Sequence, residues 1–74
     1  MVTPEEIKTW IEEKLESAVV EVEGDGQHFY ATVSSPDFAG KSMVVQHQMV
    51  YAALGDKMKA DIHALSMKTV VPEE

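Results

Sequence analysis

The 74-residue sequence contains no cysteine and no arginine, and each absence excludes a class of protein. Without thiols, the chain can form neither a disulfide nor a thiolate-ligated metal site. It also cannot hold an iron–sulfur cluster by itself through the usual cysteines. At most it can lend nitrogen or oxygen ligands to a cluster whose thiolates come from another molecule.

Long apolar runs are absent as well. No run approaches the roughly 18 residues that a membrane span needs. The N-terminus is acidic and helical in pattern, which is unlike a signal or transit peptide. We therefore expect a soluble protein of the cytoplasm, or a processed form in an organelle, without a membrane partner.

Positive charge is scarce, since six lysines stand against thirteen acids and the formal net charge is −7. Residues 1–37 hold nine acids and two lysines, whereas residues 38–72 hold four lysines and two acids. Affinity for nucleic acid depends on Lys and Arg contacts to phosphates. The composition thus argues against a strong nucleic-acid binder, although the mildly basic second half leaves weak DNA binding open.

A helix is clearly predicted over residues 3–17. Thr3 fits its N-cap, Pro4 its first position, and Glu6 the reciprocal position of a capping box. The apolar stripe comprises Ile7, Trp10, Ile11 and Leu15, and the glutamates expected on the solvated face are Glu5, Glu12, Glu13 and Glu16.

Residues 18–23 and 28–34 are predicted to form a β-hairpin across the glycine-rich residues 24–27. Alternation places one set of side chains in the core and the other outside. His28 then lies exposed, beside a turn that we expect to be flexible. The core set comprises Val20, Val22, Phe29, Ala31 and Val33, and the outer set Glu21, Glu23, Tyr30 and Thr32.

The second half predicts a loop anchored by Phe38, a helix from Ser42 to Gly55, a polar helical turn, and a last strand over residues 62–71. The element order is α-β-β-α-α-β. A helical crossover implies that the second and third strands run parallel. We expect one α+β domain over residues 1–74, a three-stranded mixed sheet with helices on one face. His63 shares the parity of the core-facing side chains of the last strand.

Three histidines are the candidates for acid–base or metal chemistry. Taken alone, His28 fits a polar hairpin residue, His47 a solvated helix face, and His63 a histidine at the core rim. Their spacing matches no metal-binding motif, and no serine lies in a nucleophile elbow. The residues alone favour a binding domain with an unknown partner, and we expect no enzymatic activity.

Three motifs closely resemble the BolA family. They are F-x-G-K at 38–41, H-Q-M-V-Y at 47–51 and I-H-A-L-S-M-K-T at 62–69, and the element order also fits. The resemblance covers nearly the whole chain and is nearest to the compact bacterial and plastid-like branch. It implies a KH-like fold of class II without the GxxG loop.

The resemblance also implies a function. Family members pair with a monothiol glutaredoxin as a heterodimer and share a [2Fe–2S] cluster with it, in iron homeostasis or cluster trafficking and sensing. His63 matches the family's histidine ligand, and His28 matches the second ligand in the hairpin. The glutaredoxin cysteine and glutathione supply the thiolates. The isolated chain is expected to hold no cofactor and to use no small-molecule substrate.

An alternative implied by the family is a small DNA-binding transcriptional regulator that uses the second helix and the short helix after it. The residues of this partner or nucleic-acid surface would be Lys41, His47, Lys57 and Lys59. Many family members carry Arg-His on the second helix. Here the pair is Gln46-His47, which removes one cation from that surface.

Overall fold

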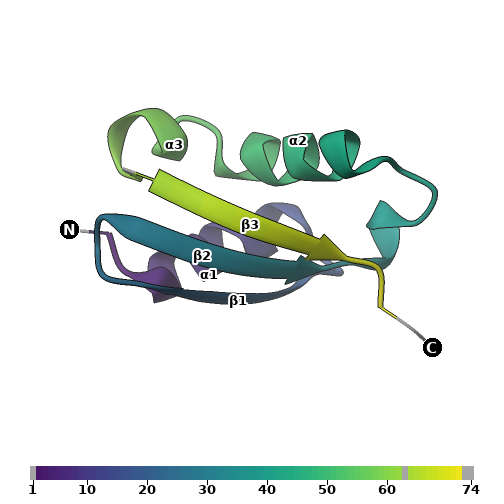
Figure 1. Cartoon of the computed structure of the whole chain (residues 1–74), viewed down its shortest axis with the longest axis horizontal. Helices are drawn as coiled ribbons and strands as arrows, with labels where there is room; N and C mark the ends of the chain where they lie inside the picture. The colour runs from purple at the N-terminus through teal and green to yellow at the C-terminus, as the bar shows by residue number, and fades with distance from the viewer. Residues whose placement is uncertain (1, 63, 73–74) are drawn as a thin grey trace.

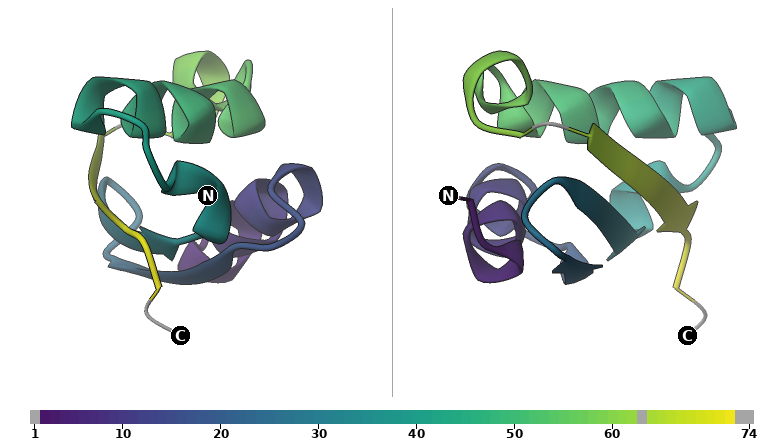
Figure 2. Two further views of the ribbon diagram at one scale, coloured as in Figure 1. Left: turned by 90° about the vertical axis from the view of Figure 1, so that its right-hand side faces the viewer. Right: turned by 60° about the vertical axis from the view of Figure 1, so that its left-hand side comes forward.

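A computed structural model of the chain describes residues 2–62 and 64–72. Figure 1 shows a three-stranded sheet, and Figure 2 shows the helices gathered on one of its faces. The expected order α-β-β-α-α-β is confirmed, with one additional short 3-10 helix, η1. In chain order the elements are α1 (Pro4–Lys14), β1 (Val19–Gly24), β2 (His28–Ser34), η1 (Pro36–Phe38), α2 (Met43–Leu54), α3 (Lys57–Ala60) and β3 (Ala64–Val70).

Helix α1 begins with the predicted capping box. The Glu6 N–H donates to Thr3 Oγ1 at 3.2 Å, and the Thr3 N–H donates to Glu6 Oε1 at 3.0 Å. The buried positions Ile7 and Ile11 anchor the helix on the sheet. Glu12 departs from the expected solvated face, because its Oε2 accepts the Val20 N–H at 3.3 Å. It thereby satisfies a donor on the edge strand β1.

The sheet order is β1-β2-β3. β1 and β2 are antiparallel and β2 and β3 are parallel, which confirms the predicted mixed sheet. Parallel neighbours need a long crossover, and here η1, α2 and α3 form it. Every core residue predicted for the hairpin faces the helices, although Val22 is only half-buried.

The core lies between the sheet and its helices. Phe38 is fully buried, so it anchors the F-x-G-K segment as predicted. The sequence predicts an irregular loop over residues 35–41, but its first part forms η1, which begins where Ser35 Oγ accepts the Asp37 N–H at 3.1 Å. The buried residues are Ile7, Ile11, Val20, Phe29, Ala31, Val33, Phe38, Val50, Leu54 and Ile62.

Helix α2 has the predicted ends. Ser42 Oγ caps the Val45 N–H at 3.2 Å, and Gly55 ends the helix with a positive φ of 57°. Within residues 2–62 and 64–72, no helix is long and apolar enough to cross a membrane.

Strand β3 is shorter than the predicted span 62–71. The Asp61 and Ile62 N–H groups both donate to the Lys57 carbonyl, at 2.9 and 2.8 Å. These two residues therefore complete the turn of α3 instead of pairing in the sheet. The prediction that His63 shares the parity of Leu65 concerns a residue that lies outside the described ones.

Candidate functional site

The hairpin turn before His28 is organised by one carboxylate. Asp25 Oδ1 accepts the backbone N–H groups of Gln27 and His28, both at 2.9 Å. The Asp25 N–H donates in turn to the His28 carbonyl at 3.2 Å, and Gly26 adopts a φ of 100°. The turn is thus more closely hydrogen-bonded than its glycines indicated. It holds the backbone of His28 while the side chain stays exposed, as predicted.

The electrostatics of the turn favour the ionised form of Asp25. The backbone N–H of His28, followed by that of Gln27, lowers the pKa of the Asp25 carboxyl below its ordinary value. Gly24 is required for a steric reason. A Cβ at that position would lie 2.4 Å from the His28 carbonyl oxygen and 2.7 Å from Phe29 Cδ1.

The sheet register brings His28 next to the start of β3. His28 pairs with Ala64, which follows His63 directly in the sequence. Figure 1 shows the β1–β2 turn and the start of β3 at the same end of the sheet. On the other side of His63, Ile62 is buried and its N–H is bonded to the Lys57 carbonyl. His63 itself lies outside the described residues.

This arrangement can be compared with the needs of an iron–sulfur cluster. Within residues 2–62 and 64–72, no group of three or more His, Cys, Asp or Glu side chains could hold a metal ion. His28 offers one exposed imidazole, and His63 adds a second in the neighbouring stretch of sequence. Two nitrogen donors fit a cluster whose other ligands come from a partner. They do not fit a cluster held by this chain alone.

The four residues predicted for a nucleic-acid surface are not gathered in one patch. Lys41 precedes α2 and Lys57 follows it, so the 12 residues of the helix, about 18 Å, separate them. Lys57 Nζ lies 4.9 Å from the centroid of the Trp10 ring, a cation–π contact with α1. Lys59 is exposed on α3, and His47 is half-buried on α2.

The solvent side of α2 carries several exposed apolar side chains beside the exposed Gln48, which the sequence reasoning missed. Met43 is 70% exposed and Val44 66% exposed, and Val45 and Tyr51 are also exposed. A signal was present in the sequence, since three consecutive apolar residues at 100° per residue cannot all face one core. Exposed apolar patches of this kind are typical of protein contact sites.

Gln46 has a structural role that the sequence reasoning also missed. Its Nε2 donates to the carbonyls of Phe38 and Lys41, at 3.1 and 2.9 Å. Its Oε1 accepts the Thr69 hydroxyl at 2.6 Å. The side chain therefore ties α2 to the F-x-G-K segment and to β3.

Comparisons with known proteins agree with the fold. Residues 4–74 match the family model described as BolA-like protein. A solved structure of a BolA protein homologue from Coxiella burnetii is 51% identical, has a TM-score of 0.91, and matches 97% of this chain and 94% of its own.

Two curated relatives differ in what their names say. Protein BOLA2 of Arabidopsis thaliana is 42% identical over 72 residues, covering 92% of this chain and 76% of its own length. The DNA-binding transcriptional regulator BolA of Vibrio cholerae is 39% identical over 51 residues. That match covers 69% of this chain and 48% of the relative.

Proposed function

The chain belongs to the BolA-like protein family, and on this basis we propose that it binds a monothiol glutaredoxin and shares a [2Fe–2S] cluster with it. The complex is a heterodimer that acts in iron homeostasis or in the trafficking and sensing of clusters. The observation that carries this proposal is the pairing of His28 with Ala64, the residue after His63. The residue that follows His63 in the sequence thereby lies beside His28 at one end of the sheet.

The chemistry of the donor set supports a shared cluster. The chain has no thiolate to offer, so the glutaredoxin cysteine and glutathione would supply the sulfur ligands. Histidine in place of cysteine on one iron raises the reduction potential of a [2Fe–2S] cluster. Because an imidazole must be neutral to bind a metal, such ligation is also sensitive to protons.

The chain's own residues prepare this end of the fold for a partner. Asp25 fixes the backbone of His28 through the turn and leaves its side chain exposed. The Lys57 carbonyl fixes Ile62, which lies before the start of β3. Held backbones lower the conformational entropy that ordering a ligand would cost.

The apolar face of α2, formed by Met43, Val44, Val45 and Tyr51, supports a protein partner over a nucleic acid. Electrostatic affinity for phosphates depends on lysine and arginine, and none of these four residues is a cation. When a protein surface covers exposed valine and methionine side chains, apolar area is removed from water and the complex is stabilised.

A second candidate is DNA binding, favoured by the name of the Vibrio cholerae relative and by Lys41, Lys57 and Lys59. The separation of Lys41 from Lys57 and the contact of Lys57 with Trp10 weaken it. The salt dependence of DNA affinity tests it. A slope of only about two or three phosphate contacts, without sequence preference, would leave non-specific attraction alone.

The test of the main proposal compares His28→Ala with Gln27→Ala. Gln27 is the exposed neighbour in the same turn, so its loss controls for disturbance of the hairpin. The glutaredoxin complex is followed by size exclusion and the cluster by its visible spectrum. We expect His28→Ala to keep the complex but to change the spectrum or speed cluster loss, while Gln27→Ala behaves as wild type. Unchanged spectrum and lifetime in His28→Ala would remove His28 from the site.

A further inference from the structure

One face of the sheet is left uncovered by the helices (Figure 2). Its side chains follow from the register, which sets Glu23 beside Tyr30 and Glu21 beside Thr32 on neighbouring strands. On the far side of β2, Ser66 and Lys68 continue these two rows. Glu21, Glu23 and Tyr30 are all exposed, so the half of this face formed by β1 and β2 is acidic and aromatic.

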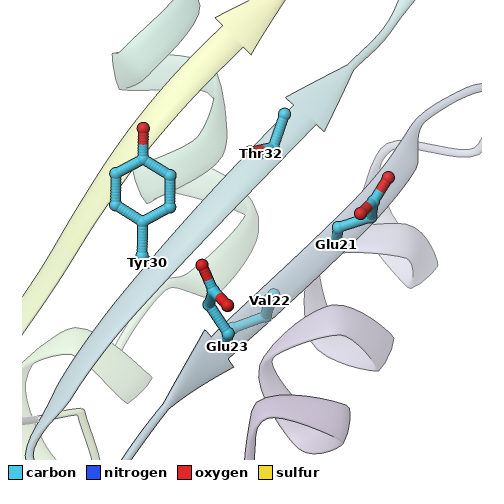
Figure 3. Close-up of a pocket in the computed structure, with 5 residues that line it drawn as sticks. All are labelled: Glu21, Val22, Glu23, Tyr30 and Thr32. Carbon is cyan, nitrogen blue, oxygen red and sulfur yellow. The ribbon is translucent and has the colours of Figure 1, made fainter.

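This half of the face is hollowed. A shallow pocket of about 190 Å³ is lined by residues of β1 and β2. Figure 3 shows the side chains of Glu21 and Glu23 on β1 and those of Tyr30 and Thr32 on β2 around it. Tyr30 is 46% exposed, so a large part of its side chain is open to a ligand. The lining residues are Glu21, Val22, Glu23, Tyr30 and Thr32.

The two carboxylates of this pocket would attract a cation. Glu21 and Glu23 are two residues apart on one face of a strand, which sets their Cα atoms about 7 Å apart. This is within the screening length of roughly 8 Å at physiological salt, so the carboxylates repel each other. The Cα atom of Lys68 lies two strands from that of Glu21, about 10 Å away, so one lysine of this face stands against two carboxylates.

The aromatic ring narrows the choice of cation. A guanidinium is planar, stacks on aromatic faces and donates two parallel hydrogen bonds to a carboxylate, whereas an ammonium is a compact point charge. Tyr30 and Glu23 are register partners, so one arginine could stack on the ring and pair with the carboxylate. Glu21 remains for a second arginine.

We propose that the open face of β1 and β2 is a docking surface for an arginine-bearing segment of a partner protein. An extended Arg-x-Arg sequence projects its two side chains to one side with the same spacing of about 7 Å as Glu21 and Glu23. The opposite charges, and the equal spacing of the two arginines and the two glutamates, identify the occupant as a cationic peptide. The inference does not depend on the cluster or on either histidine ligand.

The probe is an acetylated Gly-Arg-Gly-Arg-Gly amide, titrated into the isotope-labelled full chain and followed by amide chemical shifts. Glu21→Gln/Glu23→Gln is compared with Glu13→Gln/Glu16→Gln, which removes the same two charges from exposed positions in and just after α1. We expect the sheet pair to weaken binding about fivefold to tenfold and the control pair less than about twofold. Equal weakening by both pairs would overturn the proposal, since attraction would then follow net charge alone.

Tyr30 variants test the stacking. Tyr30→Phe keeps the ring and should bind as wild type, while Tyr30→Leu should weaken binding about threefold. The shifts are expected on the outward residues of β1 and β2. Shifts confined to α1, or equal affinity for a Gly-Lys-Gly-Lys-Gly peptide, would contradict an arginine docking surface. Displacement of the peptide by millimolar Mg²⁺ would also contradict it, because it would indicate a simple cation site.

Discussion

Among single residues, Asp25 connects the fold to the candidate ligand His28. Its carboxylate accepts two backbone N–H groups, and these lower its pKa in the folded chain. A depressed folded pKa means that the unfolded state binds the proton more readily. The stabilisation by Asp25 is therefore present above its ordinary pKa of about 4 and is lost as the pH falls through the folded pKa.

We predict that Asp25→Ala lowers the melting temperature at pH 7 and that the difference from wild type narrows below about pH 4. Thermal unfolding at several pH values measures this. The exposed Asp37 provides a control as Asp37→Ala. If the difference in melting temperature between Asp25→Ala and wild type stays constant down to pH 2, the charge of Asp25 does not contribute to stability.

Variants of His63 and Leu65 test cluster ligation and core packing separately. Leu65 is half-buried and packs against the core, so Leu65→Ala should cost about 2 kcal/mol of unfolding free energy. His63→Ala should cost less than about 1.5 kcal/mol and abolish normal cluster assembly with the glutaredoxin. Denaturant unfolding and cluster assembly are measured on both variants. If His63→Ala unfolds the domain while its folded fraction assembles a normal cluster, His63 is a packing residue.

Among the elements, those with local signals were predicted correctly from the sequence. Thr3, Ser42 and Gly55 mark helix ends by short-range capping, and alternation assigned the hairpin faces. The contacts that the sequence did not predict join residues distant in the chain. Glu12 meets Val20 eight residues on, and Gln46 meets Thr69 23 residues on. Local patterns carry no information about such pairs.

Of the candidate site, the sequence predicted the exposure of His28 but not how it would be held. Gly24 and Gly26 indicated a flexible turn, yet Asp25 organises it. The four residues proposed for nucleic acid were grouped by charge and motif, without the length of α2 that separates them. Spacing along a chain does not give distance in a fold until the intervening element is placed.

The hydrogen bonds of Gln46 predict an asymmetry within helix α2. Gln46→Ala removes three bonds at a partly buried site and should cost about 1–2 kcal/mol of unfolding free energy. Gln48→Ala, at an exposed position two residues away, should change it by less than about 0.5 kcal/mol. Urea unfolding compares the two. Equal stability of both variants would contradict a stabilising role for the hydrogen bonds of Gln46.

The apolar face of α2 makes a prediction about the partner. Val44→Gln should leave the fold intact and weaken glutaredoxin binding about fivefold, since a valine would lose its contact area. Val19→Gln is the matched control, because both valines are 66% exposed and Val19 lies on the sheet. Calorimetric titration measures both affinities. Equal affinities would place the glutaredoxin elsewhere.

For the whole molecule, the proposed ligand set is divided between two proteins. In the proposed complex His28 and His63 would supply nitrogen donors, because this chain carries no thiolate. Within residues 2–62 and 64–72 it has no metal-binding cluster of its own. Cluster binding should therefore be a property of the complex, and the purified chain should contain neither iron nor zinc in stoichiometric amount.

The most direct measurement is an anaerobic titration of this chain into a monothiol glutaredoxin loaded with its [2Fe–2S] cluster and glutathione, followed by visible absorption and circular dichroism. We predict a new spectrum that saturates at equimolar chain and glutaredoxin, and no spectrum from the chain with iron and sulfide alone. A His28→Ala/His63→Ala variant should fail to produce the new spectrum. If the spectrum of the glutaredoxin alone persists at every ratio, the chain does not share the cluster.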